Sequence, residues 1–146
     1  MKKFVIKKED IHKVAKELIS IADKSRYQGA KIIALSGDLG AGKTTLTQEV
    51  ARDLGVKENL TSPTFVIMKI YKITQKSFKR LIHIDAYRLN SDAELLNLGF
   101  QEMADNNENI IIIEWPERVP ECTKNSICKV YLSHVDSETR SLDIVV

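Results

Sequence analysis

Cysteine is scarce in this chain of 146 residues, and Cys122 and Cys128 lack the paired spacing of a metal site or a redox motif. Long hydrophobic runs are also missing, because even the run from Ile110 to Ile113 is too short to cross a bilayer. The N-terminal lysines have no apolar stretch of about seven residues behind them, so we expect no secretory signal. These features predict a cytoplasmic protein with no membrane partner.

An excess of charge of either sign is absent as well. The chain has 22 Lys and Arg against 20 Asp and Glu, which leaves a net charge of +2. No overall field therefore draws it toward DNA or anionic lipid. The remaining composition, 43% hydrophobic and 29% charged, is typical of a globular protein. No repeat, low-complexity tract or linker divides the chain, so we expect one domain over residues 1–146.

Apolar periodicity predicts an alternation of strands and helices. The expected elements, in chain order, are a strand at 3–7, a helix at 11–26, a strand around 32–35, a helix at 43–54, strands at 64–72 and 79–87, a short helix within 91–100, a strand at 109–117, and strands at 126–135 and 139–146. Asp10 and Ser91 are the expected N-caps, with Glu94 at the capping-box spacing from Ser91. A short polar link at 73–78 predicts an antiparallel hairpin. This order predicts a three-layer α/β domain with a mixed, mostly parallel sheet.

A glycine-rich stretch occupies residues 37–44, GDLGAGKT, and matches G-x-x-x-x-G-K-[ST], the phosphate-binding loop of P-loop NTPases. Glycines allow the backbone to approach a polyphosphate and to turn its N–H groups inward. Lys43 would bring charge to the β and γ phosphates, and Thr44 would offer a hydroxyl to Mg²⁺. An apolar strand precedes the stretch and a helix follows it, so we expect a P-loop NTPase-like fold. The residues expected to bind the nucleotide are Gly37, Asp38, Leu39, Gly40, Ala41, Gly42, Lys43, Thr44 and Thr45.

Two acids follow apolar strands and are candidates for the metal side of such a site, Asp85 and Glu114. Glu114 follows the more thoroughly apolar strand and is the first candidate for holding Mg²⁺, through water, whereas Asp85 would orient the attacking water or sense the γ-phosphate. Either acid alone fits a helix-capping role equally well. In the loop TSPTF, Thr64 is a candidate sensor of the metal or phosphate. Trp115 is either a core anchor or a partner contact.

Four segments, GDLGAGKTTL, SPTF, HIDAYRL and IEWPER, occur in the order and spacing of the TsaE (formerly YjeE) ATPases of bacterial tRNA threonylcarbamoyladenosine synthesis. The chain resembles this family from about residue 5 to residue 135. The P-loop is common to a large superfamily, whereas H-x-D-x-Y-R-L followed by E-W-P is specific to this one. Ile84 and Ala86, beside Asp85, depart from the usual apolar residues and carry no chemistry.

The resemblance implies that Thr44 and Glu114 bind Mg²⁺, that residues 40–45 wrap the phosphates of ATP, and that Asp85 is needed for turnover. Lys43 and Glu114 complete the expected catalytic set, and Trp115 would matter in the assembled complex. The resemblance also implies partners: an ATPase that is weak alone and works when docked on the TsaB–TsaD heterodimer, meeting tRNA only through that complex.

Two other functions compete with this one. A small-molecule kinase would use the same P-loop, but it needs an acceptor pocket and a lid with several arginines. A nucleotide-dependent switch would bind ATP without hydrolysing it, which the presence of both Asp85 and Glu114 disfavours. An efficient hydrolase needs an arginine finger, and Arg88 and Arg118 lie near the right motifs. The G-selective N-K-x-D segment is absent, which favours ATP.

Overall fold

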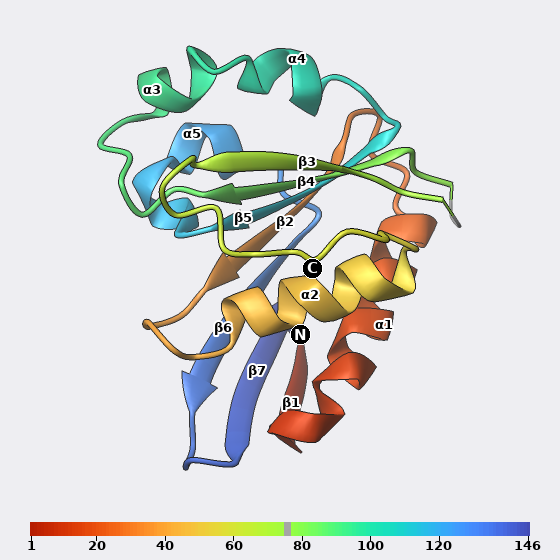
Figure 1. The fold of residues 1–146 in the computed structure, drawn as a ribbon, viewed down its shortest axis with the longest axis vertical. Coiled ribbons are helices and arrows are strands. Elements are labelled where there is room, and N and C mark those ends of the chain that lie inside the picture. The colour runs from red at the N-terminus through yellow and green to blue at the C-terminus, as the bar shows by residue number, and fades with distance from the viewer. Residues whose placement is uncertain (75–76) are drawn as a thin grey trace.

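A computed structural model describes residues 1–74 and 77–146 of the protein. A seven-stranded sheet in the order β1-β7-β6-β2-β5-β4-β3 carries helices on both faces (Figure 1). Its strands are β1 (Lys2–Lys7), β2 (Lys31–Ser36), β3 (Met68–Lys72), β4 (Arg80–Asp85), β5 (Asn109–Glu114), β6 (Cys128–His134) and β7 (Thr139–Val145). The helices are α1 (Ile11–Lys24), α2 (Lys43–Asp53), α3 (Asp92–Leu96), α4 (Phe100–Ala104) and α5 (Pro120–Thr123), with 3₁₀ turns η1 (Lys8–Asp10) and η2 (Pro116–Arg118).

Alternating side chains of the central strands divide the core into two clusters, as period-2 strand geometry requires. Ile110 and Ile112 of β5 join one cluster with the apolar faces of α1 and α2. Ile111 and Ile113 join the other, beneath α3, α4 and α5. Each face of the sheet is therefore covered by a helical layer, which confirms the expected three-layer α/β fold (Figure 1).

The sheet is mixed, with its parallel strands in the middle. β2 pairs in parallel with β5 and β6, and β4 pairs in parallel with β5. The predicted hairpin is confirmed, because β3 runs antiparallel to β4. β7 is antiparallel to both β6 and β1, so among the described strands antiparallel pairings are as numerous as parallel ones, a larger share than the sequence suggested.

The structure corrects the strand expected at 64–72. Residues 64–67 form a turn in which the Ile67 N–H donates to the Pro63 carbonyl, and β3 begins only at Met68. Ile67 has a φ of 68°, which a strand cannot contain. The link expected at 73–78 includes residues 75 and 76, which lie outside the described residues.

Helix ends differ from the sequence expectations in detail. Asp10 and Ser91 stand at the N-caps of α1 and α3, but neither side chain makes a capping hydrogen bond. Glu94 accepts from the Asn90 N–H at 3.3 Å, one residue before the N-cap, so the capping box is not formed. The helix expected to reach residue 26 ends at Lys24.

Two short helices were not expected at all. The segment 91–100 contains α3 and then the start of α4, separated by residues 97–99, of which Gly99 is the N-cap of α4 at a φ of 88°. After β5 the chain enters η2 and then α5, which begins at Pro120. A proline at the first turn of a helix needs no N–H partner there, and this is the one signal in the sequence for α5.

The two cysteines, Cys122 and Cys128, are free and buried. Burial raises the pKa of both thiols to about 12, which makes them poor nucleophiles. No helix within residues 1–74 and 77–146 is long and apolar enough to cross a membrane.

Candidate functional site

The two predicted acids stand at the same edge of the sheet. β4 and β5 run in parallel, and their register pairs Asp85 with Glu114. The neighbouring pairing of β2 with β5 places Leu35, two residues before Gly37, opposite Glu114. Parallel register therefore brings the P-loop and both acids together at the carboxyl ends of three strands, where ligands bind in open α/β sheets. Both acids are buried, with exposed fractions of 5% for Asp85 and 3% for Glu114.

The backbone of the P-loop has the glycine conformations that its sequence predicts. Gly40 and Gly42 have φ values of 78° and 107°, in the region that favours glycine. A Cβ on Gly37 would lie 2.6 Å from the Leu132 carbonyl oxygen, so only glycine fits between the loop and β6. α2 begins at Lys43 without a side-chain cap, which leaves its first N–H groups free for an anion.

The side chain of Lys43, the first residue of α2, folds back onto the glycine-rich loop. Its Nζ donates to the carbonyl oxygens of Gly37 and Asp38, the second at 3.0 Å, and lies 4.5 Å from the centre of the Trp115 ring. The side chain is buried, and this desolvation lowers the pKa of the ammonium, while the carboxylates of Glu114 and others oppose the shift. The Lys43 ammonium therefore contacts both the backbone of the glycine-rich loop and the ring of Trp115.

Glu114 meets two groups through the same oxygen. The Thr44 hydroxyl lies 3.4 Å from Oε2 and donates to it, so the two residues predicted to bind Mg²⁺ lie side by side. His83 Nε2 lies 2.6 Å from the same oxygen. His83 belongs to the segment HIDAYRL, but no role was predicted for it. The available signal was its position two residues before Asp85, which places both side chains on the same face of β4.

Asp85 holds the predicted sensor loop. Its Oδ2 accepts from the Thr64 hydroxyl at 3.0 Å, and its Oδ1 accepts from the Tyr87 N–H at 3.0 Å. Ser62 joins the same group, since its hydroxyl lies 2.7 Å from that of Thr64. The Asp85 N–H donates to the Ile67 carbonyl, which fixes the end of the loop against β4. Thr64 begins the turn at 64–67, and this turn brings its hydroxyl to the carboxylate of Asp85.

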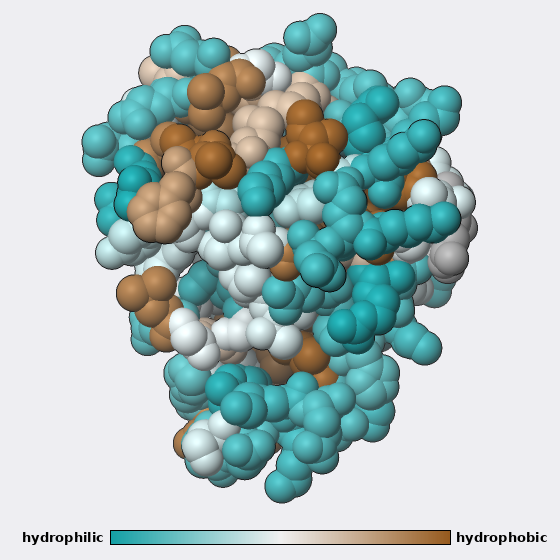
Figure 2. Space-filling model, in the orientation of Figure 1, coloured by the Kyte–Doolittle hydropathy of each residue, from teal (hydrophilic) through white to brown (hydrophobic). Residues whose placement is uncertain are grey.

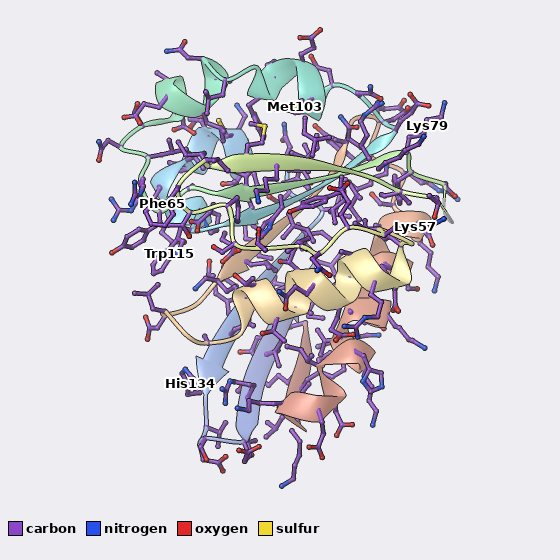
Figure 3. All side chains as sticks on the ribbon, in the orientation of Figure 1. Lys57, Phe65, Lys79, Met103, Trp115 and His134 are labelled. Atoms are coloured by element: carbon purple, nitrogen blue, oxygen red, sulfur yellow. The ribbon has the colours of Figure 1, made fainter. Side chains whose placement is uncertain are left out.

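These groups line one cavity of about 220 Å³ at the N-terminal end of α2. Its walls are formed by Leu39, Gly40, Gly42, Lys43, Thr44, Thr45, Ser62, Thr64, Asp85, Glu114 and Trp115. Phe65 and Trp115 lie on the same side of the molecule, and His134, the last residue of β6, lies below them in this view (Figure 3). The cavity thus gathers both predicted acids, the lysine, the threonines and the tryptophan.

No arginine from the described part of the chain lines this cavity. The Arg88 guanidinium stacks on the Phe65 ring, 4.5 Å from its centre, and that of Arg118 lies 5.7 Å from the centre of the Tyr87 ring. Both candidates for an arginine finger are therefore held on aromatic rings at the rim.

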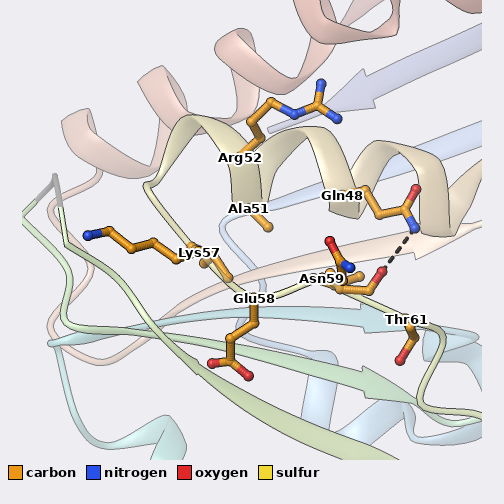
Figure 4. A pocket seen from close by; sticks show the side chains of 9 residues that line it. Gln48, Ala51, Arg52, Lys57, Glu58, Asn59 and Thr61 are labelled. Atoms are coloured by element: carbon orange, nitrogen blue, oxygen red, sulfur yellow. Dashed lines mark hydrogen bonds between the residues drawn. The ribbon is translucent and has the colours of Figure 1, made fainter.

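A larger cavity, about 500 Å³, lies between the C-terminal half of α2 and the loop 56–61 (Figure 4). Gln48 crosses it and donates to the Leu60 carbonyl at 3.0 Å. Arg52, Lys57 and Glu58 line it, and none of the residues predicted to act on a nucleotide does. The larger cavity is therefore not the candidate site, because the smaller one is lined by the residues predicted to act on a nucleotide.

Comparison with known proteins points to the family that the four sequence segments resemble. The family model described as "Threonylcarbamoyl adenosine biosynthesis protein TsaE" matches residues 5–142. The Rickettsia prowazekii "tRNA threonylcarbamoyladenosine biosynthesis protein TsaE" is 37% identical over 114 residues, which are 77% of this chain and 76% of that protein. The protein of the same description from Haemophilus influenzae is 32% identical over 130 residues, or 89% of this chain and 79% of its own length. The aligned part of the Rickettsia felis relative is 64% of that protein.

A solved structure is similar in fold. The crystal structure of Bacillus subtilis YdiB superposes with a TM-score of 0.61 over 97% of this chain and 83% of that one. At 24% sequence identity this likeness supports the fold alone. The family match over nearly the whole chain, together with relatives above 30% identity, goes further, and the chain belongs to the TsaE family.

Proposed function

We propose that this protein is an ATPase that supports the threonylcarbamoylation of tRNA adenosine as part of a complex with TsaB and TsaD. The observation that carries the proposal is the convergence of Lys43, Thr44, Asp85 and Glu114 on one cavity at the start of α2. These residues come from three separate parallel strands or their following loops, so only the folded chain brings them together.

The residues present fit a magnesium ion. Mg²⁺ prefers hydroxyl and carboxylate oxygens and commonly takes one or two ligands from the protein, with phosphates and water completing its shell. Thr44 and Glu114 supply such a pair. Within the described ranges no group of three or more His, Cys, Asp or Glu could hold a metal alone, which agrees with a site that needs the nucleotide. When bound, the ion would supply positive charge beside the β and γ phosphates.

The contacts of the remaining residues support a role for each. The uncapped N–H groups of α2 and the amides of residues 40–45 would bind the phosphates. Lys43, which donates to carbonyls of its own loop, would turn its ammonium toward the β and γ phosphates. Asp85, buried beside Thr64, would accept a hydrogen bond from the attacking water and orient it.

The apolar side chains that are exposed around the cavity support dependence on a partner. Leu39, Phe65 and Val66 are exposed beside the cavity, Phe65 to 81%. Figure 2 shows hydrophobic atoms on the margin of the molecule where Figure 3 labels Phe65. Both nearby arginines stack on aromatic rings, so among the described residues no arginine enters the cavity to supply the cation that accelerates P-loop hydrolysis about 10³–10⁵-fold. A partner covering this rim would exclude water and complete the site.

The role in tRNA modification is supported by the family to which the chain belongs, whose members are described by threonylcarbamoyladenosine biosynthesis. A net charge of +2 is small for a protein that binds a nucleic acid backbone by itself. We therefore assign contact with tRNA to the complex rather than to this chain alone.

The proposal is tested by measuring γ-phosphate release from ATP in single turnovers, by the protein alone and with the TsaB–TsaD pair. We expect slow release alone and faster release with the pair. Release in neither case would favour a nucleotide-dependent switch. Rapid formation of a phosphorylated small molecule by the isolated protein, in a screen of acceptors with labelled ATP, would instead identify a kinase.

A further inference from the structure

His83 is a fully buried histidine in the middle of β4. Its side chain has an exposed fraction of 0% and points to the α2 face of the sheet, as does that of Asp85 two residues later. Nε2 donates to Glu114 Oε2 across 2.6 Å, the short distance typical of a hydrogen bond to a charged group. The imidazole therefore contacts the metal-side acid directly, from beneath the cavity.

Packing in the core does not explain why a histidine, rather than an apolar residue, occupies position 83. Its Nδ1 is buried and has no hydrogen-bond partner within the described residues, and an unsatisfied buried polar atom destabilises a fold. An aliphatic side chain at this position would pack against the same core without that cost. The bond from Nε2 to Glu114 is the one polar interaction of the ring among the residues that the structure describes.

The bond restrains a flexible side chain. Glutamate has three rotatable side-chain bonds, and fixing them costs conformational entropy each time the carboxylate engages a ligand. Glu114 Oε2 is held by His83 from one side and faces the Thr44 hydroxyl on the other. The carboxylate therefore already points at Thr44 before any ligand binds.

We propose that His83 is a positioning residue, which sets the Mg²⁺ affinity of the nucleotide complex by fixing the carboxylate of Glu114 toward Thr44. The inference rests on the proposed function, because it needs a nucleotide bound at the P-loop. Partners that orient metal-binding groups typically contribute about 10–100-fold to metal affinity. His83 does not touch the nucleotide cavity, so the affinity for nucleotide without metal is independent of it.

The test is isothermal titration of a nonhydrolysable ATP analogue, with Mg²⁺ and with EDTA, into the wild-type protein and two variants. His83→Leu removes the donor and keeps an apolar side chain, whereas His83→Gln keeps an amide N–H near the place of Nε2. We expect His83→Leu to lose about tenfold or more of the affinity gained from Mg²⁺ and to keep the affinity measured in EDTA. His83→Gln should recover most of the loss.

A double-variant cycle separates positioning from packing. If His83 acts through Glu114, adding His83→Leu to Glu114→Gln leaves the response to Mg²⁺ unchanged. The inference is overturned if His83→Leu keeps the full gain from Mg²⁺, or if it lowers affinity equally with and without the metal. Should His83→Leu fail to fold, His83→Asn, whose amide is too short to reach Glu114, replaces it in the comparison with His83→Gln. A wild-type protein that gains nothing from Mg²⁺ would overturn the proposed function itself.

Discussion

The Thr44 hydroxyl lies 3.4 Å from Glu114 Oε2, although 70 residues separate the two in the chain. Thr44 is the second residue of α2, and Glu114 ends β5, the strand next to β2. Their proximity depends on the parallel pairing of β2 with β5, which places the carboxyl ends of both strands at one edge of the sheet. The pairing therefore brings together the hydroxyl and the carboxylate that we propose to hold Mg²⁺.

The P-loop glycines offer a matched pair of substitutions. Gly40→Ala and Gly99→Ala each place a side chain at a similar positive φ, 78° and 88°, and neither new Cβ would meet a heavy atom closer than 3.7 Å. Both variants should therefore lose a similar free energy of unfolding, about 1–2 kcal/mol. Only Gly40→Ala should also weaken binding of an ATP analogue, by about tenfold, because it shifts amides at the cavity. Chemical denaturation and calorimetric titration measure the two effects, and equal affinity in both variants would contradict the role of the loop.

Asp85 is predicted to act on turnover rather than on binding. Asp85→Asn keeps the shape of the side chain and an acceptor for the Tyr87 N–H, but it no longer presents a carboxylate to water. We expect ATP affinity within a few-fold of wild type and γ-phosphate release slower by about a hundredfold or more. Asp23→Asn, on the exposed surface of α1, is the control. Loss of binding and turnover in equal measure would refute the assignment.

We expect the free energy of unfolding to depend on pH through the buried ammonium of Lys43. Burial lowers the pKa of its ammonium, so between that pKa and the ordinary value of about 10.4 the unfolded chain binds more protons than the folded one. The free energy of unfolding contributed by this group therefore rises with pH in that window. Urea denaturation of wild type and Lys43→Met, from pH about 7 to pH about 10, isolates it. Wild type should gain stability relative to Lys43→Met as pH rises, and a constant or falling difference would contradict the burial effect.

The exposed rim predicts where a partner acts. Phe65→Ser removes an aromatic ring that is 81% exposed, so the isolated protein should keep its stability and its affinity for ATP. Stimulation of γ-phosphate release by the TsaB–TsaD pair should need about tenfold more of the pair, as expected when an aromatic anchor is lost. Val5→Ser, at an exposed position on β1, is the matched control. Identical stimulation of both variants would place the docking surface elsewhere.

The sequence predicted the parts of this molecule that local chemistry determines. Glycine spacing located the P-loop, and the buried runs before Asp85 and Glu114 identified the strands that carry the acids. The predictions were less accurate where tertiary contacts determine the local backbone structure. Residues 64–67 are apolar and β-prone, yet hydrogen bonds to Pro63 and to Asp85 hold them in a turn.

Other misses have similar physical causes. The capping box at Ser91 failed because Glu94 accepts from the Asn90 N–H instead. His83 had no visible role, because a histidine among strand residues is indistinguishable from a core residue until its neighbour on β5 is known. The 2.6 Å bond to Glu114 depends on the register of two strands, which composition and periodicity do not specify.

The most direct test of the account is a crystal structure of the protein with Mg²⁺ and a nonhydrolysable ATP analogue. We predict that the phosphates lie against the amides of residues 40–45, with the metal bound by the Thr44 hydroxyl and within reach of Glu114, directly or through one water. A triphosphate found elsewhere, or a metal distant from both Thr44 and Glu114, would contradict it.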